Sequence, residues 1–126
     1  MKTWMLFLLG IFYLQAQIEE PVVWEKSLEQ LSEDRYLLKF EAQIAPKWHL
    51  YSQFSNPDGA IPTEFVFDDL EGYQLIGTVE ESESITDFDQ VFEMDLTYFK
   101  ERATFQQEIQ ITNSDINQVK VEINYQ

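Results

Sequence analysis

The stretch YLLKFEAQI, residues 36–44, decides the fold class of this 126-residue chain. Apolar side chains occupy every second position and mostly polar ones stand between them; the apolar set is Tyr36, Leu38, Phe40, Ala42 and Ile44. Successive side chains of a β-strand point to opposite faces of a sheet, so this alternation indicates a strand with one buried face. We therefore expect residues 36–44 to pack one face on an apolar core.

The same alternation recurs along most of the chain. It marks residues 65–67, 73–79, 92–98, 103–111 and 119–125, and residues 22–28 are a seventh candidate strand. Turn sequences separate these runs, and in the clearest one, residues 56–59, Pro57 presets φ for a type I turn that Gly59 closes. No segment shows a sustained helical period. Short strands between turns predict an all-β, immunoglobulin-like antiparallel β-sandwich.

The first residues have the pattern of a secretory signal peptide over residues 1–16. Lys2 precedes an apolar run over residues 4–14, and Ala16 offers a small residue for cleavage before Gln17. An apolar run of eleven residues is shorter than the roughly 20 needed to cross a bilayer core. We expect residues 17–126 to form one exported, soluble domain that does not insert into a membrane.

Charge and cysteine content exclude several classes of function. The formal charge is −15, and it becomes −16 without residues 1–16, whose only charged side chain is Lys2. Such a body repels nucleic acid and anionic membrane surfaces, so we expect neither as a partner. There is no cysteine, which excludes disulfides and thiol chemistry within these residues. Glycine-rich phosphate loops are also absent, and we expect no cofactor.

The single histidine, His49, is a candidate metal ligand or general base only if partners converge on it. With no cysteine and no second histidine, a zinc site would need carboxylates alone, and the spacing fits no zinc motif. In a strand, Trp48 and Leu50 would share one face and His49 and Tyr51 the other. We expect a structural or half-exposed His49 and no metal site at this residue.

Two acidic clusters raise the question of calcium. One is formed by Asp68, Asp69 and Glu71; the other is formed by Asp87, Asp89, Glu93 and Asp95. Neither has the ligand order of an EF-hand loop, so solvated turn residues are the default interpretation and a looser calcium site is the alternative.

The segment SITDFDQVFEMDLTYF, residues 84–99, sets Phe88 between Asp87 and Asp89 just ahead of an alternating run. A large apolar ring in an acidic loop is either a lid over a site or a contact for a partner. The alternative is that the ring folds back onto its own core.

Most of the mature chain resembles a known family. The resemblance is carried by PVVWEKSLEQLSEDRYLLKFEAQIAPKWHLYSQ (21–53), AIPTEFVFDDLEGYQLIGTVEESESITDFDQVFEMDLTYFKERATFQQEIQI (60–111) and VKVEINYQ (119–126). These segments look like the N-terminal periplasmic domain of the DsbD family of thiol:disulfide interchange proteins. The resemblance implies a periplasmic immunoglobulin-like domain of a protein-disulfide reductase system. Its implied partners are a membrane electron-relay domain and periplasmic thiol-disulfide proteins.

The resemblance also implies roles for particular residues. Residues 86–90 correspond to a cap loop, with Phe88 as the shielding ring between Asp87 and Asp89; Trp48, Leu50 and Tyr51 correspond to an aromatic strand beside the site. An apolar lid denies stray thiols access to a disulfide, and nearby carboxylates disfavour a thiolate.

The family's two redox cysteines are expected just beyond residues 119–125, and the sequence reaches Gln126 without them. We therefore expect a sandwich that lacks its last strand or hairpin, with no catalytic residue and no redox activity alone, because thiol exchange requires a thiolate. The alternative is a non-catalytic secreted immunoglobulin-like binding module that meets a basic or calcium-bridged partner through its acidic face.

Overall fold

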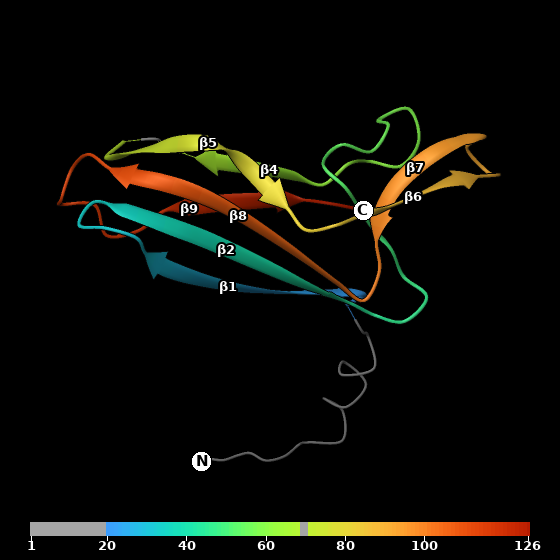
Figure 1. Ribbon diagram of the computed structural model, residues 1–126, viewed down its shortest axis with the longest axis horizontal. Coiled ribbons are helices and arrows are strands. Elements are labelled where there is room, and N and C mark those ends of the chain that lie inside the picture. The colour runs from blue at the N-terminus through green and yellow to red at the C-terminus, as the bar shows by residue number, and fades with distance from the viewer. Residues whose placement is uncertain (1–19, 69–70) are drawn as a thin grey trace, which may run out of the picture.

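The computed structural model describes residues 20–68 and 71–126, so the expected signal peptide lies outside the described residues (Figure 1). The described part contains nine strands: β1 (Val22–Gln30), β2 (Arg35–Ile44), β3 (Leu50–Tyr51), β4 (Glu64–Asp68), β5 (Tyr73–Glu81), β6 (Ile85–Asp89), β7 (Met94–Phe99), β8 (Arg102–Ile111) and β9 (Lys120–Asn124). Within these two ranges, no helix has the length and apolar character needed to cross a membrane.

The strands form three antiparallel sheets. The largest has the order β1-β2-β8-β5, a second pairs β4 with β9, and a third has the order β3-β7-β6. Figure 1 shows the β6–β7 hairpin extending past one end of the four-stranded sheet. The predicted all-β antiparallel fold is confirmed, and the arrangement is consistent with a β-sandwich.

The alternation in residues 36–44 places the core. Phe40, Ala42 and Ile44 are buried on one face of β2. In the register with β8, Phe40 lies opposite Phe105 and Ala42 opposite Ala103, both also buried. Since directly opposed side chains lie on the same face of a sheet, the two central strands present one continuous apolar surface.

Phe65 of β4 joins the two-stranded sheet to this surface. Its ring centroid lies 5.3 Å from that of Phe40 and 4.9 Å from that of Phe105. Trp24 of β1 extends the cluster, with its ring centroid 5.8 Å from Phe105 and 5.5 Å from Tyr125. Tilted and edge-on aromatic pairs at such distances are each worth about 0.5–1.5 kcal/mol beyond the burial of their area.

One buried position of β8 is polar, although the sequence pattern marked only apolar residues there. Gln107 is 1% exposed, and its Nε2 donates hydrogen bonds to the carbonyl oxygens of Ile76 at 3.0 Å and Glu108 at 2.8 Å. The register of β5 against β8 shifts between Ile76 and Glu80, where Gly77 has a φ of 73°. The amide of Gln107 therefore bonds the backbone of β5 where the ladder is interrupted.

Replacing Phe40 with alanine tests the core. Because the ring is 8% exposed and packs on Phe65, Phe40→Ala should lower the free energy of unfolding by about 3–5 kcal/mol. Urea denaturation measures the loss. Leu28→Ala is the control, because Leu28 lies in the same sheet but is 60% exposed, and it should change stability far less. A loss below about 1 kcal/mol for Phe40→Ala would contradict this placement of the core.

Candidate functional site

The β6–β7 hairpin is built around a four-residue connection, residues 90–93. β6 pairs with β7 so that Asp89 lies opposite Met94. The Asp89 carboxylate accepts hydrogen bonds from the backbone N–H groups of Val91 at 2.8 Å and Phe92 at 3.0 Å, and Glu93 closes the turn with a φ of 57°. An aspartate that binds the backbone two residues ahead is a local turn former, so the sequence itself fixes the end of this hairpin.

The resemblance predicts that residues 86–90 form a cap loop, and this prediction is wrong for residues 86–89. Asp87, Phe88 and Asp89 lie in strand β6, and only the connection beyond them is a turn. Cross-strand pairing outweighs the low strand propensity of aspartate. A hydrogen bond of 3.0 Å between the hydroxyl groups of Thr86 and Thr97 adds to this pairing.

The end of the hairpin exposes three apolar side chains, which we call the hairpin tip: Phe88, Val91 and Phe92. They are 63%, 85% and 38% exposed, respectively. The alternative in which the Phe88 ring folds back onto its own core is therefore wrong. Carboxylates flank the hairpin tip: Asp87 and Asp89 on β6, Glu93 in the connection and Asp95 on β7. The result is an apolar end with an acidic border.

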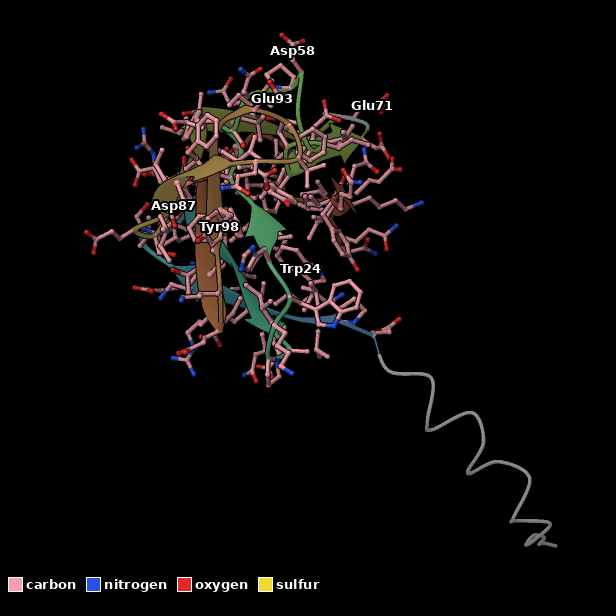
Figure 2. The ribbon with its side chains drawn as sticks, turned by 90° about the vertical axis from the view of Figure 1, so that its right-hand side faces the viewer. Trp24, Asp58, Glu71, Asp87, Glu93 and Tyr98 are labelled. Atoms are coloured by element: carbon pink, nitrogen blue, oxygen red, sulfur yellow. The ribbon has the colours of Figure 1, made fainter. Side chains whose placement is uncertain are left out.

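Tyr98 of β7 links this hairpin to the single histidine. Its hydroxyl donates a hydrogen bond of 3.0 Å to the Asp87 carboxylate, and Figure 2 shows the two side chains next to each other. The hydrogen bond, with a smaller effect of burial and of the nearby negative charge, raises the pKa of Tyr98 above its ordinary 10.0. The other partner of the Tyr98 ring is His49, stacked at a centroid distance of 4.1 Å and an interplanar angle of 21°.

His49 does not lie in a strand, contrary to the sequence prediction. It is exposed in the connection that precedes β3. Among the described residues, no side chain forms a hydrogen bond or ion pair with its imidazole, and its contact is the stack on Tyr98. Nothing in this surrounding orients the ring as a general base, because no carboxylate or hydroxyl is positioned on it.

The expected aromatic strand is only partly formed. Leu50 and Tyr51 make up β3, where they pair with Phe99 and Tyr98 of β7. Trp48 is not in this strand, because its N–H closes a turn onto the Ala45 carbonyl at 3.0 Å and its side chain is 55% exposed. The structure therefore places Leu50 and Tyr51 in the same sheet as Phe88 and leaves Trp48 outside it.

Sequence reasoning missed a polar anchor just after β3. The buried Ser52 hydroxyl donates to one carboxylate oxygen of Glu81 at 2.5 Å, and the Gln53 N–H donates to the other at 3.1 Å. The Ser52 N–H donates to the Thr97 carbonyl at 2.9 Å. These bonds attach the segment after β3 to both β5 and β7. Phe54 follows directly in this segment, and its side chain is 73% exposed. The sequence gives no signal for a pair 29 residues apart.

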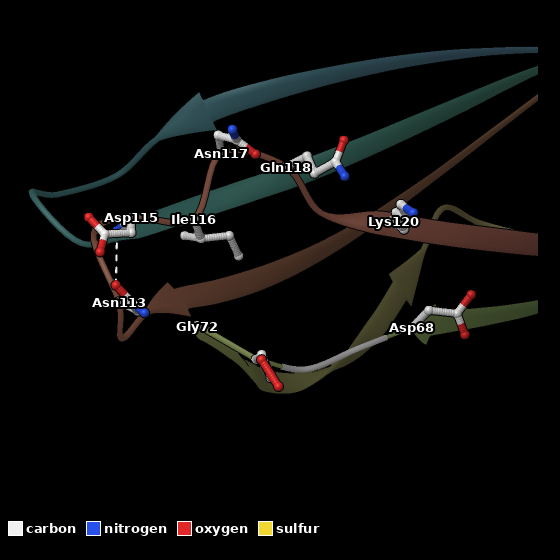
Figure 3. Close-up of a pocket in the computed structure, with 9 residues that line it drawn as sticks. Asp68, Gly72, Asn113, Asp115, Ile116, Asn117, Gln118 and Lys120 are labelled. Atoms are coloured by element: carbon white, nitrogen blue, oxygen red, sulfur yellow. Dashed lines mark hydrogen bonds between the residues drawn. The ribbon is translucent and has the colours of Figure 1, made fainter.

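Asp68 and Glu71 of the first acidic cluster border a hollow of about 310 Å³ between the ends of β4 and β8 and the starts of β5 and β9 (Figure 3). Asp68, Glu71 and Asp115 line it together with Lys120. Across residues 20–68 and 71–126, no three His, Cys, Asp or Glu side chains gather in a way that would hold a metal ion. Asp69, which the calcium interpretation included, lies outside the described residues.

Comparison of the chain with protein-family models, with curated proteins and with solved structures found no match. The family resemblance therefore stays a prediction.

Removing the Asp87 charge tests the contact with Tyr98. A raised pKa favours the neutral phenol in the folded state, so the stabilisation is present below pH 10.0 and is lost as the pH rises through the raised pKa of Tyr98. Asp87→Asn should therefore lower the pKa of Tyr98 toward 10.0, as followed by the ¹³Cζ NMR shift of this ring during an alkaline titration.

Asp95→Asn is the matched control, because Asp95 is a hairpin carboxylate opposite Phe88 and therefore on the other face of the sheet. An unchanged pKa of Tyr98 in Asp87→Asn, or an equal change in both variants, would contradict the assignment.

Proposed function

We propose that this chain is a periplasmic β-sandwich domain of a thiol:disulfide relay, in which the hairpin tip shields a sulfur pair and receives partner proteins. The observation that carries the proposal is the Phe88 ring, held 63% exposed on a paired strand. The resemblance to the DsbD family supplies the class of reaction, and the position of Phe88 supplies the part that this chain would play in it.

The hairpin tip is better explained by a binding role than by folding. Burying a phenylalanine side chain fully is worth roughly 1.5–3 kcal/mol. In the free domain the exposed rings of the hairpin tip do not contribute most of this burial energy to folding. The turn itself is nevertheless fixed by two backbone hydrogen bonds to Asp89. A rigid backbone that presents an apolar ring is suited to covering a reactive group or to entering an apolar cleft of a partner.

Strand alternation sets the direction in which Phe88 points. Phe88 is opposite Asp95, and Asp95 lies on the same face of β7 as Phe99, which is buried in the core. The ring therefore stands on the Phe99 face of the sheet, and the opposite face carries Leu96, which is equally buried. Tyr98 and Asp87 occupy the opposite face.

The 126 residues contain no cysteine, and thiol exchange needs a thiolate as nucleophile. The proposal therefore assigns the sulfur pair to polypeptide that this sequence does not include, and it assigns no catalytic residue to these residues. The carboxylate of Asp95, which shares the face of Phe88, would raise the pKa of a thiol covered by this ring and slow its exchange with stray disulfides.

A second candidate function is a non-catalytic binding module. It is favoured by the same hairpin tip and its acidic border, which together fit a partner with an apolar cleft and a basic rim. The two candidates differ in sulfur content, because only the relay requires a cysteine pair in the natural protein.

Thiol counting in the protein isolated from its natural source separates the two candidates. After reduction, alkylation and mass spectrometry, the relay predicts one pair of modified cysteines. Phe88→Ala should then speed alkylation of that pair, because it removes the shield. Phe54→Ala is the matched control, since Phe54 is also exposed, at 73%, but lies outside the hairpin.

A natural protein without cysteine would contradict the relay and leave the binding module. Equal alkylation rates in the wild type and Phe88→Ala would contradict the shielding role even if the cysteines are present.

A further inference from the structure

A second hollow, of about 560 Å³, lies beside the turn that leaves β2 and the turn that joins β7 to β8. We call it the β2–β3 pocket. It is lined by Ile44, Ala45, Pro46, Lys47, Trp48, His49, Lys100 and Glu101. None of the hairpin tip residues lines this pocket, and a ligand there is independent of the proposed function.

The first wall of this pocket is a tight turn over residues 45–48. The Trp48 N–H donates to the Ala45 carbonyl at 3.0 Å, with Pro46 and Lys47 as the central residues. Lys47 has a φ of 74°, so the turn is of type II, where glycine is the usual residue at this position. A lysine there holds a conformation that L-residues with a side chain seldom adopt.

The second wall is also strained. The Arg102 N–H donates to the Lys100 carbonyl at 2.8 Å, which forms a three-residue turn around Glu101, whose φ is 72°. This positive-φ form of the γ-turn is rare. The Ile44 N–H donates to the Glu101 carbonyl at 2.9 Å and joins the two walls. Strained backbone is concentrated at sites that bind ligands, and two of the three non-glycine residues with positive φ in the described part of the chain border this pocket.

Two cations without an ion pair line this pocket. Lys47 and Lys100 make no ion pair among the residues that the structure describes; Lys26 and Lys120 also make none, but neither of them lines this pocket. Two unpaired ammonium groups on one hollow complement an anion. The carboxylate of Glu101 and the formal charge of −15 oppose a polyanion, so a ligand with a single negative charge fits best.

Planar side chains in the pocket indicate that the uncharged part of that ligand is a flat ring. The Trp48 indole is 55% exposed although it borders a hollow. The His49 imidazole is held by its stack on Tyr98 at 4.1 Å. The exposed Trp48 indole and the His49 imidazole offer faces on which a flat apolar group can stack. We propose that the β2–β3 pocket binds a small planar organic carboxylate, with its charge on Lys47 and Lys100 and its ring against Trp48.

NMR titration of the ¹⁵N-labelled protein with phenylacetate tests this inference. Saturable shifts are expected in the backbone amides of residues 47–50 and 100–102. Phenylacetamide, which has the same ring but no charge, should bind at least about tenfold more weakly, the loss expected for one charge-assisted contact. Acetate, which has the charge but no ring, should also bind at least about tenfold more weakly, because it cannot stack on Trp48.

Three variants localise the effect. Lys47→Gly should raise the melting temperature, because glycine accepts a positive φ without strain, and should weaken phenylacetate binding about tenfold. Lys100→Gln should weaken binding by a similar factor. Lys120→Gln is the matched control, because it removes a lysine that borders the other hollow, and it should leave binding unchanged.

The inference is overturned if phenylacetate and phenylacetamide bind equally well or if no saturable shift occurs at residues 47–50 and 100–102. It is also overturned if Lys120→Gln weakens binding as much as Lys100→Gln. If Lys47→Gly alters the turn, Lys100→Gln still tests the role of the lysines, because Lys100 is not part of that turn.

Discussion

The packing of one aromatic ring, Phe65, between two sheets supports the rest of the structure. Its ring contacts Phe40 of β2, Phe105 of β8 and Trp24 of β1, so the β4–β9 pair is held against the four-stranded sheet by edge-on and tilted aromatic contacts. Phe99 of β7 reaches the same cluster through Phe105, at a centroid distance of 5.6 Å. The base of the projecting hairpin is thus anchored in the core, and this anchoring allows its far end to carry exposed apolar groups.

Much of this core could be predicted from the sequence, because one face of each central strand is buried. The alternation in residues 36–44 is confirmed by the burial of Phe40, Ala42 and Ile44. The same rule fails at Gln107, where the partner strand bulges and a buried amide bonds its backbone. A bulge depends on a long-range register that local periodicity does not encode.

The candidate site was less predictable for the same physical reason. Phe88 could be singled out because a large apolar residue between two aspartates is unusual, but the strand that holds it is stabilised by pairing with β7, which overrides the propensity of aspartate. The turn over residues 45–48, which keeps Trp48 out of β3, depends on a positive φ at Lys47. Glycine is the usual residue at this position of the turn, so a sequence with lysine there does not predict it. The contact of Ser52 with Glu81 had no local signal at all.

β7 connects the two surfaces to which we assign binding roles. One of its faces carries Tyr98, which lies between Asp87 of the hairpin and His49 of the β2–β3 pocket. The central claim is that the hairpin is formed in the free protein and keeps the Phe88 ring in solvent. The most direct test is the paramagnetic relaxation of phenylalanine ring protons by a soluble, uncharged gadolinium chelate. The account predicts an enhancement for Phe88 close to that of the exposed Phe54 and well above that of the buried Phe99. Protection of Phe88 equal to that of Phe99 would contradict it.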